Sequence, residues 1–387
     1  MDVGTREHYE VLAPKEADAL AFLAALVNQD SGSDDPPGVN RVGAQMAGAL
    51  RELGFRVERV PQRGRGDHLI ARSGDGPRRL LLLAHMDTVY PAGTARGRPF
   101  RVEGERAFGP GVADMKGGLC ALVFALRALA AAGALPPPGA AITAALTSDE
   151  EVFSPTSRDL IVREARGAAA VAVLEPARAN GECVVARRGA GRYVLNVLGR
   201  AAHAGNQPEL GVNAIWDLAQ KVCAIQALAD AFPGATVNVG TIRGGERSNM
   251  IPDHAAAEIG VRAATPDGAA ALTRALEAVA ATAHVPSARA TLEGEWGFPP
   301  WPEQEATGRL LALLRQAAAP LGVAIGAVPA GGASDGNRTW PHAPTIDGLG
   351  PSGDRLHSPD EFIWVRSLVE RAAILAGFIE LWAARQD

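Results

Sequence analysis

Histidine and carboxylate side chains end several apolar or Gly-rich runs of this sequence. His85 and Asp87 close the run in "LLLAHMDTVYP", and Glu150 with Glu151 follows "AAITAALTS". Three further candidates occupy comparable places: Glu175 in "AAAVAVLEP", Asp114 in "FGPGVADMKGG" and His357 in "GPSGDRLHSPDEF". Imidazoles and carboxylates without cysteine suit Zn²⁺, or Co²⁺ and Mn²⁺ in its place. Two histidines shared between two ions, with a bridging aspartate, would form a two-metal hydrolytic site.

The adjacent pair Glu150 and Glu151 suits a general base beside a metal ligand. Neighbouring side chains of an extended segment point in opposite directions, so one carboxylate can bind metal while the other reaches a metal-bound water. Such a pair is usually part of a solvated loop, and a lone strand-end histidine such as His85 is more often structural. The metal-site interpretation therefore depends on the separate segments meeting in space.

The first half of the chain alternates helical and strand-like segments. Short apolar runs bounded by turn residues, typical of strands buried on both faces, are "RRLLLLAH", "GAAITAALTSDEE" and "AAAVAVLEP". Between the first two lies "MKGGLCALVFALRALAAAG", whose apolar residues recur at helical spacing. This alternation predicts an α/β fold, a mixed sheet with helices on both faces. Ligands bind such sheets at the carboxyl ends of the strands, where the candidate residues lie.

Beyond Gly189 the pattern changes to strand, helix, two strands, helix and strand. That order predicts an open-faced, four-stranded α+β domain with its helices on one side. After "GFPPWP" the chain returns to helix, short strands and a last helix from Ile363 to Ala384. We therefore predict a discontinuous catalytic domain, residues 1–189 and 301–387, interrupted by a domain at 190–300.

Composition narrows the function further. The 387 residues are 47% hydrophobic, which is ample for two cores, and the formal net charge of -5 gives no electrostatic case for nucleic acid. We expect no membrane span, because no apolar run reaches about 18 residues. The first residues are partly acidic and lack a compact apolar core, so we expect no signal peptide. Three widely spaced cysteines (Cys120, Cys183 and Cys223) favour a reducing compartment, the cytoplasm.

Taken together, the motifs resemble those of the M20 family of dinuclear zinc peptidases, and most of all its glutamate carboxypeptidase type. The similarity covers nearly the whole chain in order and spacing: "AHMDTV", "GPGVADMKGG", "TSDEE", "EP", "GRAAHAGNQPELGVNAI", "SNMIPD" and "HSPDEF". The resemblance implies two Zn²⁺ ions. His85, Asp114 and Glu175 would hold one ion, and Asp114, Glu151 and His357 the other.

The same resemblance assigns the catalytic roles. Glu150 would deprotonate the bridging water and pass the proton to the leaving amine. Asp87 would accept a hydrogen bond from the second ring nitrogen of His85, which fixes the tautomer. The peptide bond after Asp114 is expected to be cis. His203 would come from the partner subunit of a homodimer and stabilise the tetrahedral oxyanion, a role that competes with a plain surface histidine.

Three residues are expected to bind the substrate. The resemblance makes Asn249 a contact to the carbonyl and Arg262 a fork for a free carboxylate, although a surface salt bridge is the alternative for Arg262. Gly332, in the Gly-rich loop "GGASDGN", would offer backbone N–H groups to the same carboxylate. The segment after "LEP" lacks the lysine of some glutamate-specific relatives, which leaves an acidic side-chain pocket in doubt unless Arg187 or Arg188 substitutes.

The predicted function is a homodimeric, metal-dependent amidohydrolase or carboxypeptidase. It would release a C-terminal amino acid from a small N-acyl or N-aroyl conjugate or a short peptide with a free carboxylate. The nearest alternative is a deacylase of the acetylornithine or succinyl-diaminopimelate type. A non-catalytic metal-binding dimeric scaffold and a metal-free binding protein are further alternatives, but a scaffold has no need of a base at Glu150.

Overall fold

The computed structural model describes residues 4–385, which divide into two compact units. The first unit runs to Ala186 and includes Glu303–Ala330 and the chain from Ser334 onward. The second comprises Arg187–Pro302 together with Gly331–Ala333. The domain predicted at 190–300 falls inside the second unit.

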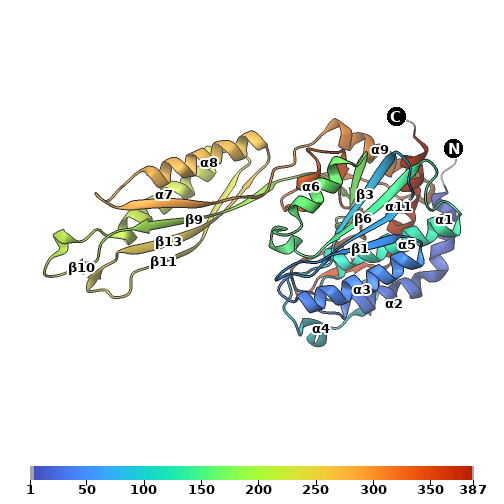
Figure 1. The fold of residues 1–387 in the computed structure, drawn as a ribbon, viewed down its shortest axis with the longest axis horizontal. Helices are drawn as coiled ribbons and strands as arrows, with labels where there is room; N and C mark the ends of the chain where they lie inside the picture. The colour runs from blue at the N-terminus through green and yellow to red at the C-terminus, as the bar shows by residue number, and fades with distance from the viewer. Residues whose placement is uncertain (1–3, 386–387) are drawn as a thin grey trace. The chain divides into compact units, whose positions relative to one another are not determined.

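A six-stranded mixed sheet forms the centre of the first unit (Figure 1). Its strands, in spatial order, are β1 (Arg56–Val60), β2 (His68–Ser73), β6 (Ala140–Thr147), β3 (Arg78–His85), β7 (Ala170–Val173) and β16 (Thr345–Ile346). β3 pairs in parallel with both β6 and β7, whereas β2 runs antiparallel to its two neighbours. The parallel strands therefore end at the same edge of the sheet.

Helices cover both faces of this sheet, which confirms the predicted fold class. Alternate residues of β3 point to opposite faces, so Leu80 and Leu82 belong to one apolar cluster, and Leu81 and Leu83 to another. The first cluster includes residues of α2 (Glu16–Val27), α3 (Pro36–Glu52), α5 (Gly118–Ala131), α9 (Glu305–Ala318) and α11 (Val365–Ala384). The second includes Leu160 and Ile161 of α6 (Arg158–Arg166). Because Leu82 is fully buried, Leu82→Ala is expected to cost about 2–5 kcal/mol.

A small second sheet joins two segments that lie far apart in the sequence. Its strands, in spatial order, are β17 (Gly353–Asp354), β18 (Phe362–Trp364), β5 (Arg106–Phe108) and β4 (Arg101–Glu103). Phe362 pairs with Phe108, and their ring centroids lie 6.0 Å apart. The loop between β17 and β18 carries His357, and the chain leaving β5 carries Asp114. This sheet therefore sets both candidate ligands on one scaffold.

The second unit is built on a four-stranded antiparallel sheet with both of its helices on one face (Figure 1). The strands, in spatial order, are β11 (Thr236–Gly244), β13 (His254–Ala263), β9 (Gly189–Leu198) and β14 (Arg289–Phe298). The helices α7 (Ala214–Ala231) and α8 (Pro266–Ala281) begin at Asn213 and Thr265, whose side chains accept N-terminal backbone N–H groups. The order of elements is the one predicted from the sequence. Over residues 4–385, no helix combines the length and apolar character that crossing a membrane requires.

Candidate active site

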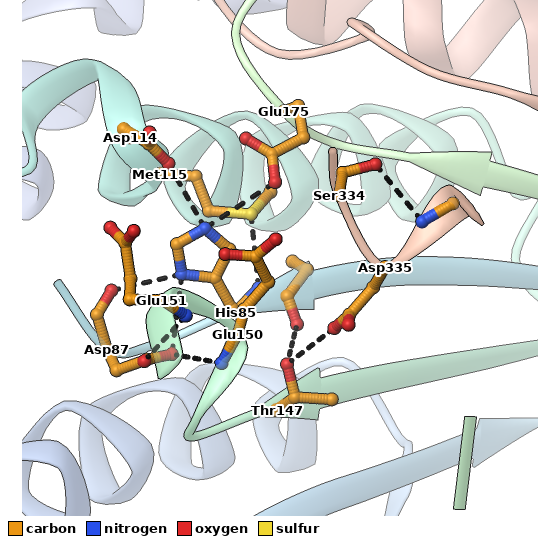
Figure 2. Close-up of polar contacts among 12 residues, drawn as sticks. His85, Asp87, Asp114, Met115, Thr147, Glu150, Glu151, Glu175, Ser334 and Asp335 are labelled. Carbon is orange, nitrogen blue, oxygen red and sulfur yellow. Dashed lines mark hydrogen bonds and ion pairs between the residues drawn. The ribbon is translucent and has the colours of Figure 1, made fainter. Parts of the chain in front are cut away.

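Three neighbouring strands deliver candidate residues to one edge of the main sheet (Figure 2). His85 is the last residue of β3, Glu150 and Glu151 follow β6, and Glu175 follows β7. The His85 and Glu150 side chains are buried, and Figure 2 shows the carboxylates of Glu150, Glu151 and Glu175 around the His85 ring. The structure therefore brings these three segments together, as the sequence predicted.

The two carboxylate oxygens of Asp114 face two different sets of residues. Asp114 Oδ1 lies 3.1 Å from His85 Nε2, which is itself 3.5 Å from Glu175 Oε1. Asp114 Oδ2 lies 3.3 Å from His357 Nε2, which is also 3.3 Å from Glu151 Oε2. Single ligand atoms of His85, Asp114 and Glu151 all lie within 4.8 Å of one another. This division matches a carboxylate bridge between two cations.

The electrostatics of the cluster favour added positive charge. Burial, and after it the Asp114 carboxylate, raises the pKa of Glu151 and of Glu175 to about 7 in each case. Hydrogen bonds to Asp114 and Glu151 raise the pKa of His357 to about 10. Glu151 Oε1 is buried and has no hydrogen-bond partner. A buried, unpartnered carboxylate oxygen is costly unless a cation compensates it, so these residues fit divalent metal ions.

Glu150 lies beside this cluster with a raised pKa. Burial is the largest cause, and the carboxylates of Glu175 and Asp335 raise the pKa further, against the opposing effect of His85. Its backbone N–H donates to Asp87 Oδ1 at 3.2 Å, and that of Glu151 donates to Asp87 Oδ2 at 3.2 Å. Asp87 therefore fixes the backbone of the turn that presents both glutamates.

The contact between Asp87 and His85 differs in detail from the expected one. His85 Nδ1 lies 3.0 Å from the backbone carbonyl oxygen of Asp87 and 3.5 Å from its carboxylate Oδ1. The carbonyl is thus the closer acceptor, because the carboxylate is held by the Glu150–Glu151 turn and by Ser33 Oγ, which donates to Oδ2 at 2.6 Å. Either acceptor places the proton on Nδ1 and leaves Nε2 directed at Asp114.

The Asp114 turn is held by a glutamate that sequence reasoning did not single out. Glu361 is buried and accepts hydrogen bonds from the backbone N–H groups of Gly111, Ala113 and Asp114 at 2.9–3.1 Å. Tyr90 also donates to it, at 2.7 Å. The peptide bond from Asp114 to Met115 is cis, as expected. A glutamate four residues after His357 in "HSPDEF" was the available signal, although nothing in the sequence linked it to Asp114.

A second missed residue braces the turn that carries Glu150. Asp335 accepts a hydrogen bond from Thr147 Oγ1 at 3.1 Å and from Ser154 Oγ at 2.5 Å. Figure 2 shows the contact between Asp335 and Thr147, which ends β6 before the two glutamates. Ser154 follows the glutamates in the chain, so Asp335 ties both ends of the turn. Burial raises the pKa of Asp335 to about 6.

The predicted substrate-binding residues and His203 all belong to the second unit. His203 is exposed on β10 (Ala202–His203), which pairs with β12 (Met250–Ile251), and the backbone N–H of Ala204 donates to the Asn249 carbonyl at 3.1 Å. His203 and Asn249 are therefore neighbours. Arg262 is half-buried on β13, and the carbonyl of exposed Gly332 accepts a hydrogen bond from Arg187 at 3.1 Å. The functional roles of these four residues stay predictions.

Known proteins similar to this chain match it over most of its length. The model of Peptidase family M20/M25/M40 matches residues 81–381. Carboxypeptidase G2 of Pseudomonas sp. (strain RS-16) is 32% identical over 380 residues, covering 96% of this chain and 91% of that protein. A succinyl-diaminopimelate desuccinylase of Sphingopyxis alaskensis is 28% identical over 390 residues, covering 94% and 98%. The solved structure of aminopeptidase PepT from Bacillus cereus has the same fold, with a TM-score of 0.76 at 23% identity over 96% of this chain and 99% of that one.

These similarities agree with the chemistry of the cluster. They support a metal-dependent enzyme of the carboxypeptidase and amidohydrolase type that acts on small substrates. The resemblance predicted from the motifs is confirmed, and the chain belongs to peptidase family M20/M25/M40.

Proposed function

We propose that the cluster holds two zinc ions and that this enzyme hydrolyses an amide next to a free carboxylate. His85, Asp114 and Glu175 are the ligands of one ion, and Asp114, Glu151 and His357 those of the other. The observation that carries the proposal is that the two Asp114 oxygens face two separate histidine–glutamate pairs. Co²⁺ and Mn²⁺ suit the same nitrogen and oxygen donors and are expected to substitute.

The protein's own residues divide the proton transfers. When bound, the metal ions lower the pKa of a water molecule and polarise the scissile carbonyl. Glu150 takes the proton from the attacking water and delivers it to the leaving amine, a task that favours a carboxylate with a raised pKa. The Asp87 carboxylate keeps Glu150 in place by accepting a hydrogen bond from the Glu150 backbone N–H. His203 donates to the developing oxyanion.

The substrate is an N-acyl or N-aroyl amino acid or a short peptide. Arg262 and the Gly332 loop bind its free carboxylate, and Asn249 contacts its carbonyl group. The similarity to carboxypeptidase G2 over 96% of the chain supports this reaction over that of an acetylornithine-type or succinyl-diaminopimelate-type deacylase. We leave open which amino acid side chain the enzyme prefers. Arg187, a candidate cation for binding an acidic side chain, already donates a hydrogen bond to the Gly332 carbonyl.

A homodimer formed through the second unit is part of the proposal, since His203 is expected to act on the partner's substrate. Support comes from large apolar side chains that this unit exposes: Trp216 is 61% exposed on α7 and Ile242 is 55% exposed on β11. β11 is also an edge strand, whose free backbone groups can pair with a second copy. The cytoplasm stays the compartment predicted from the cysteine usage.

Hydrolysis of a panel of N-acyl amino acids tests the proposed function. The zinc-loaded enzyme is expected to release the C-terminal amino acid from glutamate, aspartate or neutral conjugates, and the rates rank the side chains. A chelator should abolish turnover, and added zinc, cobalt or manganese should restore it. Matched amides without the free carboxylate serve as controls and should react far more slowly. Turnover that resists the chelator would refute the mechanism.

A further inference from the structure

His357 is the most exposed of the candidate metal ligands. Its side chain is 51% exposed, whereas those of Asp114 and Glu151, which face it, are 12% and 6% exposed. Residues 355–361, the His357 loop, connect β17 to β18. In this loop Arg355 and His357 adopt φ angles of 59° and 60°, in the left-handed region that favours glycine. Such a loop needs contacts from outside to hold an imidazole beside the cluster.

Two side chains from another segment donate to the carbonyl of Ser358, which directly follows His357. The Tyr90 hydroxyl donates to this oxygen at 2.9 Å, and Arg98 Nη1 donates to it at 3.4 Å. Bonds inside the His357 loop, such as that from Ser358 Oγ to the Arg355 carbonyl at 2.6 Å, shape the turn without fixing where it lies. The bonds to the Ser358 carbonyl tie the peptide next to the imidazole to the chain that follows β3.

Tyr90 is itself held firmly by its surroundings. It stands five residues after His85, and Thr88 between them pairs with Gly32 in a parallel bridge. A Cβ atom on Gly32 would lie 2.4 Å from the Tyr90 carbonyl oxygen, so the two backbones are in direct contact. The Arg98 guanidinium lies 4.8 Å from the centroid of the Tyr90 ring. The hydroxyl is therefore presented by a fixed backbone and a packed ring.

The one proton of this hydroxyl has two acceptors. Besides the Ser358 carbonyl, Glu361 Oε2 lies 2.7 Å away, and the Glu361 carboxylate holds the Asp114 turn. Burial, and after it the Glu361 carboxylate, raises the pKa of Tyr90 above its ordinary value, so the hydroxyl keeps its proton and remains a donor. Tyr90 thus touches a support of His357 and a support of Asp114.

We propose that Tyr90 is a positioning residue for the metal ion assigned to Asp114, Glu151 and His357, and that its bond to Ser358 strengthens the binding of that ion. This role rests on the proposed two-ion site. Without the hydroxyl, the Ser358 carbonyl loses the nearer of its two donors from outside the His357 loop. The imidazole is then less restrained beside the two carboxylates that face it.

The other ion should not depend on this bond. Its ligands His85 and Glu175 come from the ends of β3 and β7, whose pairing in the main sheet is independent of the His357 loop. Loss of the Tyr90 hydroxyl should therefore weaken one ion and spare the other. A role through Glu361 alone would weaken both, because Asp114 is proposed to bridge them.

The two zinc affinities of Tyr90→Phe test the proposal, because this variant keeps the ring and loses only the hydroxyl. Stepwise chelator competition measures both affinities, and His357→Ala and Glu175→Ala identify which step belongs to which ion. The ion assigned to His357 should bind about tenfold more weakly, and the other should stay within about twofold of the wild type. At saturating zinc, kcat should return to near the wild-type value, since every ligand remains.

Tyr193→Phe is the matched control, because it removes a hydroxyl that lies 3.0 Å from Thr273 Oγ1 in the second unit. It should keep both wild-type zinc affinities. Equal affinities in Tyr90→Phe and this control would overturn the proposal, and so would an equal loss at both ions, which would assign the effect to Glu361. Fewer than two zinc ions on the wild-type chain would instead refute the proposed two-ion site itself.

Discussion

The Asp87 carboxylate accepts hydrogen bonds from three groups in different parts of the site. Its donors are Ser33 Oγ and the backbone N–H groups of Glu150 and Glu151, and the carboxylate is fully buried. The interaction with His85, followed by the hydrogen bonds from Ser33 and from the Glu151 backbone, lowers the pKa of Asp87, although burial opposes this shift. The residue therefore connects His85, a proposed metal ligand, to the turn that carries Glu150, the proposed general base.

Asp87→Asn is expected to lower metal affinity and kcat by about 10–100-fold, because an amide turns an N–H group toward backbone N–H donors. Chelator competition would measure the affinity, and turnover at saturating zinc would measure kcat. Asp75→Asn, at an exposed aspartate of the same unit, is the control and should match the wild type. Wild-type zinc affinity and kcat in Asp87→Asn would show that Asp87 has no positioning role.

The candidate ligands could be predicted from the sequence because residue types that suit a metal ion stand just after predicted strands. His85 and Glu175 directly follow short apolar runs, and Glu151 follows another such run after four polar residues. Short apolar runs bounded by turn residues are typical of buried strands. The bracing residues Glu361 and Asp335 had no such signal. Their partners lie about 250 and 190 positions away in the chain, and hydrogen bonds to backbone N–H groups or hydroxyls leave no mark on residue spacing.

At the scale of elements, whether a strand could be predicted from the sequence depended on how that strand is buried. β3, β6 and β7 were predictable because both of their faces are covered, which demands continuous apolar sequence. β5 and β18 have three residues each, and their pairing depends on a partner more than 250 residues away. Such short strands have no periodicity to detect, although they place Asp114 and His357 on one scaffold.

Glu361→Gln tests how the Asp114 turn is held. The amide cannot accept all four hydrogen bonds, so zinc affinity should fall and the free energy of unfolding should drop by about 1.5–3 kcal/mol. High zinc concentrations should restore most of the turnover, since the ligands themselves remain.

Zinc titration and denaturant unfolding check this prediction. Glu305→Gln is the matched control, because the Glu305 side chain is 93% exposed and pairs only with Arg309 on its own helix among the ion pairs of the described chain. Both quantities should stay at wild-type values in the control. If the Glu361→Gln protein keeps wild-type zinc affinity, Glu361 does not support metal binding.

At the scale of the whole molecule, the sequence predicted an insertion and, through the family resemblance, a homodimer, but not the surface through which two copies would pair. The change from alternating α/β to βαββαβ marks the second unit, because each pattern implies a different sheet. The surface through which two copies would pair leaves a weaker signal in the sequence. Trp216 and Ile242 are apolar residues in amphipathic elements, and only the structure shows that they are exposed.

Mixed dimers test the proposed role of His203 across subunits. His203→Ala and Glu150→Gln homodimers should both be nearly inactive. After the two variants are dissociated and reassociated at equal concentration, about a quarter of wild-type activity should return, because random pairing gives each mixed two-fold dimer one complete site. Size-exclusion chromatography with light scattering should confirm the dimer. No recovery in verified mixed dimers would place His203 in its own subunit's site, and a His203→Ala homodimer with wild-type activity would place it outside catalysis.

The most direct test of the central claim is the metal content and turnover of Glu150→Gln beside the wild type. After zinc loading and removal of free metal, both proteins should hold two zinc ions per chain, because the proposal makes Glu150 the base and not a ligand. Turnover of the variant should be about 10²–10⁴-fold lower. Fewer than two zinc ions per wild-type chain, or variant turnover within about tenfold of the wild type, would contradict the account.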